Sequence, residues 1–128
     1  MEFKAIIHEE YKHIDIEIGG YTIRTDQPVE KGGTGVGPNP GKLLLSAVAS
    51  CTLATAYGYC HRNDLPLPTG MSVHVDGDED FSKIQFEIHL PQDFPESRVK
   101  AVHKAADACW VKKQWLNPPE FTTHIVKE

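Results

Sequence analysis

Apolar and polar residues alternate along the first 25 residues of the chain. In YKHIDIEI, residues 11–18, every second residue from Ile14 onward is isoleucine, and polar residues occupy the positions between. A period of two predicts a β-strand with one buried face. Residues 3–8 and 21–25 have the same character, and Gly19-Gly20 supplies a turn. The pattern therefore predicts a three-stranded antiparallel meander.

A long uncharged segment follows a loop that is rich in glycine and proline. Asn39 is a favoured N-cap and Pro40 a favoured first helical residue, so we expect a helix from Pro40 to about Arg62. No residue between Leu43 and Tyr59 is charged. A helix that is apolar on all sides is typically buried inside protein. A membrane-spanning helix is the weaker interpretation, because the segment also contains several serines and threonines.

The second half of the chain predicts a hairpin, a second helix and a last strand. Apolar residues alternate in segments 71–75 and 84–90, which an acidic turn connects. A second helix opens at Pro95, and its apolar stripe ends at Cys109. Residues 121–126, FTTHIV, predict a short final strand. The expected order is βββ-α-ββ-α-β, an α+β fold.

The chain length and the central helix together predict a dimer. A chain of 128 residues suits a single domain, residues 1–128, with one core. One sheet of this size cannot cover a long helix that is apolar on every side. We therefore expect a homodimer in which two subunits jointly bury these helices.

Composition excludes several classes of function. The formal net charge is −5 and no basic run is present, which disfavours nucleic acid as a partner. The first ten residues have no apolar segment of the kind found in a secretion signal. Three widely spaced cysteines fit neither a disulfide framework nor a zinc site. The histidines are scattered, without the spacing of a metal site on a helix. We expect a cytoplasmic protein without a bound metal or cofactor and without a membrane partner.

The glycine-rich loop is not a phosphate-binding loop. A Walker-type loop needs a glycine five residues before Gly41-Lys42, and that position is Val36. The residue after the lysine is Leu43, which offers no hydroxyl to magnesium. Pro38 and Pro40 also remove backbone N–H groups that such a loop would direct at phosphate. The loop therefore leads into the helix without binding a nucleotide.

The cysteines are the candidates for chemistry. Cys51 and Cys60 lie nine residues apart on one predicted helix, so they face opposite sides and are separated by roughly 13 Å. That separation is too long for a disulfide. If two cysteines cooperate, one of them is Cys109. On periodicity alone, a pair formed by Cys51 and Cys109 and a set of small buried thiols are both open interpretations.

Two segments resemble one known family. Residues 37–67, GPNPGKLLLSAVASCTLATAYGYCHRNDLPL, resemble the central helix of the OsmC/Ohr family, the osmotically inducible and organic hydroperoxide resistance proteins. The cysteine of that helix lies eleven residues after a proline, which is the spacing from Pro40 to Cys51. Residues 99–126, VKAVHKAADACWVKKQWLNPPEFTTHIV, resemble the segment that carries the family's second cysteine. The order of strands and helices is similar over nearly the whole chain.

The resemblance implies a fold and an activity. The fold is an intertwined α+β homodimer with a long buried central helix, and the activity is reduction of organic hydroperoxides by a thiol. By position, Cys51 would be the peroxidatic cysteine and Cys109 the resolving one. The resulting disulfide would be reduced by an external dithiol, either a lipoyl group or a small thiol, and no cofactor would be bound. Arg24 stands where some branches carry the arginine that stabilises the thiolate.

One departure from the family keeps two other functions open. The glutamate that holds this arginine directly follows the proline of the motif, and here that position is Gly41. The alternatives are a non-catalytic dimer of the same fold that binds an apolar ligand, and another cysteine-based redox or transfer activity.

Overall fold

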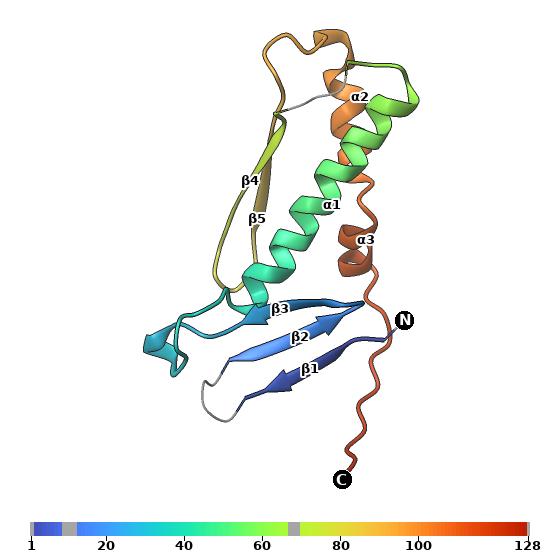
Figure 1. Cartoon of the computed structure of the whole chain (residues 1–128). Helices are drawn as coiled ribbons and strands as arrows, with labels where there is room; N and C mark the ends of the chain where they lie inside the picture. The colour runs from blue at the N-terminus through green and yellow to red at the C-terminus, as the bar shows by residue number, and fades with distance from the viewer. Residues whose placement is uncertain (1, 9–12, 67–69, 128) are drawn as a thin grey trace. The chain divides into compact units, whose positions relative to one another are not determined.

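The computed structural model describes residues 2–8, 13–66 and 70–127. The chain divides into two compact units, Met1–Ser46 and Ala47–Glu128, and each is described by itself (Figure 1). That the chain forms one domain therefore stays a prediction.

The N-terminal unit contains the predicted meander. Strands β1 (Lys4–Ile7), β2 (Ile14–Ile18) and β3 (Tyr21–Thr25) are antiparallel in the order β1-β2-β3. The turn between β2 and β3 uses Gly19 and Gly20, both with positive φ. This two-residue turn pairs Ile18 with Tyr21, and the register that follows places Asp15 opposite Arg24. The predicted strands are confirmed.

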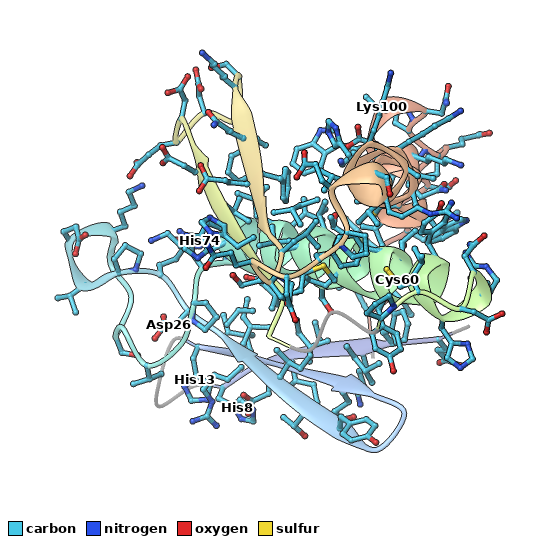
Figure 2. All side chains as sticks on the ribbon, turned by 90° about the horizontal axis from the view of Figure 1, so that it is seen from above. His8, His13, Asp26, Cys60, His74 and Lys100 are labelled. Atoms are coloured by element: carbon cyan, nitrogen blue, oxygen red, sulfur yellow. The ribbon has the colours of Figure 1, made fainter. Side chains whose placement is uncertain are left out.

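The loop after β3 is organised by one carboxylate. Asp26 is buried, and its carboxylate accepts hydrogen bonds from the backbone N–H groups of Gln27, Thr34 and Val36 and from the Thr34 hydroxyl (Figure 2). These donors stabilise the charged form and lower the pKa of Asp26 to about 2. A short 3-10 helix, η1 (Val29–Lys31), lies within the loop. Asp26 thus holds the loop together with backbone hydrogen bonds, such as those from Gly33 N–H to the Pro28 carbonyl oxygen and from Gly35 N–H to that of Gln27.

Helix α1 (Pro40–Arg62) has the predicted bounds. The Asn39 side chain caps it, accepting the Lys42 N–H at 2.8 Å. Its buried residues are four positions apart, so they form one stripe: Val48, Thr52, Ala56 and Cys60. Within one chain the helix is thus covered along a stripe and not on every side. By length and composition α1 would also pass for a membrane-spanning helix, a property it shares with core helices of soluble proteins.

The C-terminal unit packs a hairpin and a helix against this stripe. Strands β4 (Ser72–Gly77) and β5 (Ile84–His89) form the predicted antiparallel pair. Helix α2 (Glu96–Asp107) follows, and the core cluster joins residues of α1 and α2 with Phe94. Partly buried side chains from β5 and the adjoining loops pack against that cluster, among them Ile88 and Leu90.

Two sequence predictions about the C-terminal segment were wrong. The second helix was expected to reach Cys109. Instead, α2 ends at Asp107 and a separate helix, α3 (Trp110–Leu116), follows. Cys109 is the N-cap of α3, and its sulfur accepts the Lys112 N–H.

The predicted strand at 121–126 is also absent. Residues 120–127 form no helix or strand and pair with no described strand, and their apolar side chains, such as Ile125 at 92 % exposure, are exposed. A strand needs a neighbour for its backbone hydrogen bonds. The observed order is βββ-α-ββ-α-α, and the α+β class is confirmed.

Candidate active site

Cys51 lies on α1 between Val48 and Thr52, the first two residues of the buried stripe. Its side chain is half-buried, and it is a free thiol. The hydroxyl of Thr55, one turn later, donates to the Cys51 carbonyl oxygen at 2.8 Å and lies 3.9 Å from Cys51 Sγ. The helix thus presents the sulfur beside a local polar group.

Cys109 is fully buried between α2 and α3, also as a free thiol. Its Sγ donates to the carbonyl oxygen of Val48 at 3.9 Å. Val48 is three residues before Cys51 and shares its side of α1. The α2–α3 junction therefore carries Cys109 onto the turn of α1 that holds Cys51.

The pKa of Cys51 depends on groups at the α2–α3 junction, the Cys109 side chain among them. Burial by itself raises the pKa of the Cys51 thiol. The backbone N–H of Val111, the Cys109 side chain, the Thr55 hydroxyl and the backbone N–H of Trp110 act in the opposite direction. Together they hold the pKa of Cys51 below its ordinary value. Backbone N–H groups in the first turn of a helix have no intrahelical acceptor, so they are free to serve a thiolate.

The donors at the start of α3 were not found by sequence reasoning. They are backbone groups of Trp110 and Val111, which any residue except proline supplies. A prediction that a helix starts directly after Cys109 would have indicated these donors.

Cys60 lies in a different environment. It is fully buried in the apolar cluster of α1 and α2, and burial raises the pKa of its thiol (Figure 2). A buried thiol without stabilising donors is a poor nucleophile. Cys60 is therefore an internal control for the chemistry of Cys51.

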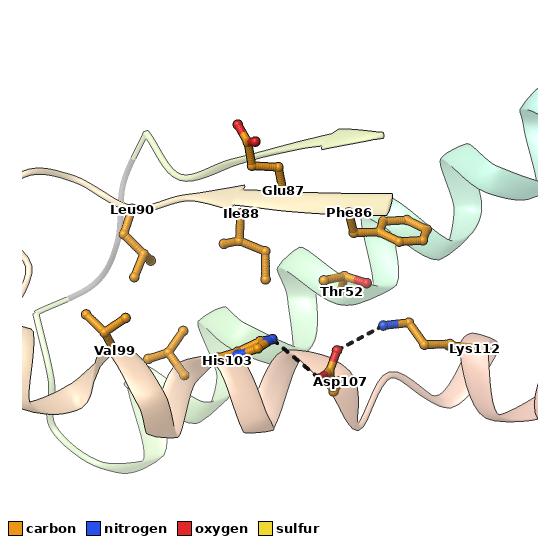
Figure 3. A pocket seen from close by; sticks show the side chains of 10 residues that line it. Thr52, Phe86, Glu87, Ile88, Leu90, Val99, His103, Asp107 and Lys112 are labelled. Atoms are coloured by element: carbon orange, nitrogen blue, oxygen red, sulfur yellow. Dashed lines mark hydrogen bonds and ion pairs between the residues drawn. The ribbon is translucent and has the colours of Figure 1, made fainter. Parts of the chain in front are cut away.

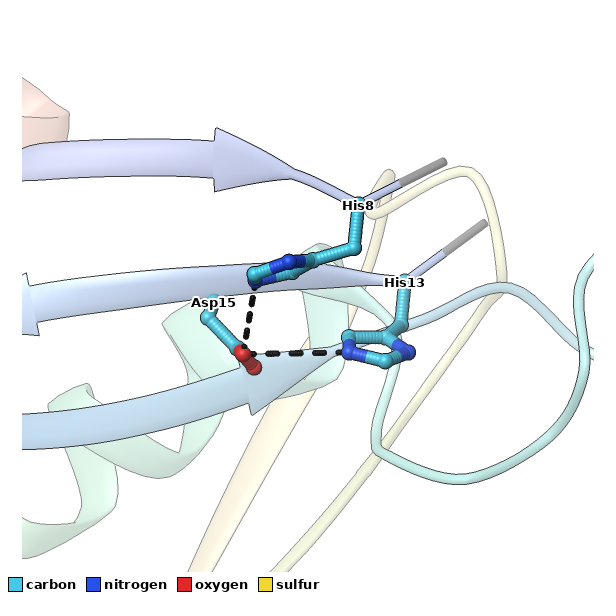
Figure 4. Close-up of side chains that lie close together, drawn as sticks. All are labelled: His8, His13 and Asp15. Carbon is cyan, nitrogen blue, oxygen red and sulfur yellow. Dashed lines mark ion pairs between the residues drawn. The ribbon is translucent and has the colours of Figure 1, made fainter. Parts of the chain in front are cut away.

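Arg24 belongs to the N-terminal unit, where it is held by Asp15. The guanidinium donates Nε to Asp15 Oδ1 at 2.8 Å and Nη2 to Oδ2 at 3.2 Å. His8 and His13 also point at this carboxylate (Figure 4). The hydrogen bond from Arg24 is the main cause of a lowered pKa of Asp15. Sequence reasoning missed Asp15, although the Gly19-Gly20 turn and the strand register already place it opposite Arg24.

A cavity of about 290 Å³ lies between strand β5 and the helices of the C-terminal unit (Figure 3). Thr52 from α1 and Lys112 from α3 line it. Thr52 directly follows Cys51, and Lys112 is three residues after Cys109. Its body is apolar, from Phe86, Ile88, Leu90, Val99 and Val102. At its polar side the Lys112 ammonium pairs with Asp107 at 3.2 Å. Neither this cavity nor a second of about 300 Å³ beside it, which Val48 and Trp115 help to line, is lined by a cysteine.

The comparisons with known proteins identify the family. The family model described as OsmC-like protein matches residues 32–124, so the chain belongs to the OsmC-like family. No curated protein matches the chain. The resemblance in sequence is thereby confirmed at the level of the family.

Solved structures share the fold at low sequence identity. A candidate osmotic stress induced and detoxification response protein from Psychrobacter arcticus has a TM-score of 0.75 and 21% identity, over 88% of this chain and 85% of that one. An OsmC-like protein from Mycoplasma pneumoniae has a TM-score of 0.62 and 21% identity, over 91% and 87%. An organic hydroperoxide resistance protein OsmC from Legionella pneumophila has a TM-score of 0.55 and 18% identity, over 88% and 85%. The OsmC-like fold is therefore established.

Proposed function

We propose that the protein has a redox role in the stress response and acts as a thiol-dependent peroxidase that reduces organic hydroperoxides. One observation carries the proposal. The half-buried thiol of Cys51 has a pKa lowered by groups that include the Cys109 side chain, and the buried Cys109 thiol bonds to the Val48 carbonyl oxygen on the same turn of α1. A stabilised thiolate beside a second thiol is the arrangement that a peroxidatic and a resolving cysteine require.

The reaction proceeds in three steps. The Cys51 thiolate attacks the terminal oxygen of the hydroperoxide, the O–O bond breaks, and the leaving alkoxide takes a proton to become an alcohol. Cys51 is then a sulfenic acid. The sulfur of Cys109, after losing its proton, displaces hydroxide from this sulfenic acid, which gives a Cys51–Cys109 disulfide and water. An external dithiol, a lipoyl group or a small thiol, then reduces the disulfide by exchange and is itself oxidised.

Thiolate stabilisation would come from backbone donors together with Arg24. The N–H groups of Trp110 and Val111 support a charged Cys51 without a neighbouring cation. For Arg24, Asp15 supplies the carboxylate that Gly41 cannot supply. In this proposal Asp15 is a positioning residue that keeps the guanidinium extended. Replacing Arg24 with Met is then expected to slow the reaction of Cys51 with peroxide, and Asp15→Asn to slow it less.

The same proposal includes a cytoplasmic homodimer. Several large apolar side chains are exposed in the single chain, such as Tyr57 on α1, Trp110 at 67 % exposure and Phe121 at 84 %. Burial of such side chains by a second copy is the expected outcome for a soluble protein. Sedimentation equilibrium of the full chain would test it, and a monomer at micromolar concentration would contradict it.

An apolar-ligand protein is the second candidate function. The two adjoining cavities favour it, because their walls are mainly aliphatic and aromatic and each is large enough for a small organic molecule. Under this alternative the cysteines would remain reduced in the presence of hydroperoxide.

One experiment separates the two candidates. Reduced protein is treated with cumene hydroperoxide, and the disulfides are mapped by mass spectrometry of non-reduced peptides. The peroxidase proposal expects a rapid Cys51–Cys109 bridge, which Cys51→Ser abolishes. Cys60→Ser is the matched control, because Cys60 is a buried thiol of the same helix, and it should leave the bridge unchanged. Thiols that stay reduced, or oxidation that is equally fast in Cys51→Ser, would refute a peroxidase.

A further inference from the structure

A group of metal-ligand side chains lies on the exposed face of the β4–β5 hairpin. His74 on β4 is the direct register partner of Glu87 on β5, and His89 is two residues further along β5. Directly opposed residues, and residues two apart on one strand, share a face of a sheet. Phe86 and Ile88 point the other way, toward the helices, whereas Glu87 points away from them (Figure 3). The fold therefore gathers these three side chains on one face.

The three side chains converge closely. One ligand atom from each lies within 4.8 Å of the others. His89 Nε2 is 2.5 Å from Glu87 Oε1, and the rings of His74 and His89 stack with centroids 4.3 Å apart. Ligand atoms around a tetrahedral Zn²⁺ lie about 2.0–2.2 Å from the ion, hence roughly 3.3 Å from one another. All three side chains are exposed, so they have room to rotate toward a shared ion.

The donor set selects the class of ion. Two imidazoles and one carboxylate suit zinc and related divalent transition metals better than magnesium or calcium, which prefer oxygen ligands. From these positions we infer a Zn²⁺ site formed by His74, Glu87 and His89, with a fourth position open to water. The site belongs to a different face of the unit from the cysteine chemistry and does not depend on it.

A second group of possible metal ligands lies in the N-terminal unit and is the less favourable site. His8 and His13 also converge on a carboxylate, that of Asp15, and their ligand atoms are equally close. There Arg24 binds both oxygens of Asp15, so a cation already neutralises the carboxylate and would repel a second one. For Glu87, the only ion pair among the described residues is the one with His89. The hairpin group therefore offers the better site.

Zinc titration of the full-length protein tests the inference. Purified apo-protein competes for Zn²⁺ with a chromophoric chelator at about pH 7.5, because metal binding competes with protons for the ligand atoms. We expect one Zn²⁺ per chain assigned to this site. His74→Ala and His89→Ala should each lower the Zn²⁺ affinity at least about tenfold, since removal of even an outer-shell partner of a metal ligand lowers metal affinity 10–100-fold. His8→Ala, which removes a histidine from the competing cluster, and Cys51→Ser should leave this affinity unchanged.

Co²⁺ in place of Zn²⁺ gives a second readout, the visible absorption spectrum, which reports the type of ligand atom. A site of nitrogen and oxygen ligands gives weak visible bands and no thiolate-to-cobalt charge-transfer absorption. Absence of Zn²⁺ binding would overturn the inference, as would binding that survives His89→Ala but is lost in His8→Ala or Cys51→Ser. Strong charge-transfer absorption that Cys51→Ser removes would assign the metal to the thiols instead and would equally overturn it. Far-ultraviolet circular dichroism confirms that the variants, all at exposed or half-buried positions, stay folded.

Discussion

The thiol of Cys109 is held 3.9 Å from the carbonyl oxygen of Val48, one turn before Cys51 on α1. This contact joins two helical segments that are about sixty residues apart in the chain, and it puts the start of α3 beside Cys51. The reactivity of Cys51 should therefore depend on the α2–α3 junction as much as on its own helix.

The first prediction concerns the order in which the cysteines react. The pKa of Cys51 is lowered and that of Cys60 is raised, so as pH rises the Cys51 thiolate forms first. Iodoacetamide labelling of native protein between about pH 5 and pH 9, read by peptide mass spectrometry, should modify Cys51 at the lower pH. Cys109→Ala removes one of the donors and should move the Cys51 profile to higher pH. Labelling of Cys60 before Cys51 would contradict the assignment.

The second prediction is a pH dependence of stability that comes from Asp26. Its pKa is about 2 in the folded protein and near 3.8 in an unfolded chain, so its contribution is fully present above about pH 4 and is lost as pH falls through about 2. Urea midpoints of the wild type should therefore fall more steeply than those of Asp26→Asn over this window. Asp26→Asn should also be less stable at pH 7, because a neutral amide accepts four hydrogen bonds less well than a carboxylate. Glu120→Gln, at an exposed position, is the control, and an equal loss in both variants would refute the role of Asp26.

The third prediction contrasts two glycines. A Cβ on Gly33 would lie 1.9 Å from the carbonyl oxygen of Gln27, so the backbone must shift, and Gly33→Ala should destabilise the fold by about 1–3 kcal/mol. A Cβ on Gly58 would meet only the flexible end of Arg62, at 3.1 Å. Gly58→Ala lies inside α1 and should raise the free energy of unfolding by up to about 1 kcal/mol. Chemical denaturation of the two variants checks the difference in sign.

The fourth prediction tests the core of the C-terminal unit. Val102 of α2 is 1 % exposed and belongs to the cluster with Ala56 and Cys60. Val102→Ala removes two buried methyl groups and should lower the free energy of unfolding by about 2 kcal/mol. Val29→Ala makes the same chemical change at 69 % exposure and should change stability by less than about 0.5 kcal/mol. Comparable losses in the two variants would place the core elsewhere.

Local patterns in the sequence were sufficient for most of the secondary structure. The alternation in β1 to β3 and the cap at Asn39 each act over a few residues, and the structure confirms the elements that they predict. The same local reasoning carried the second helix too far. It missed that α2 ends at Asp107 and that a new helix starts at Trp110, because the apolar spacing of α2 continues past its end to Cys109.

The sequence by itself determined the α+β class, the bounds of α1 and the choice of Cys51 and Cys109 as the cysteines of interest. Only the tertiary structure brought the Cys109 thiol to the turn of α1 that carries Cys51 and supplied the N–H donors of Trp110 and Val111. The physical reason is that an element forms from interactions between near neighbours in the chain. A site forms from contacts between residues far apart in the sequence, and these exist only once the elements have packed.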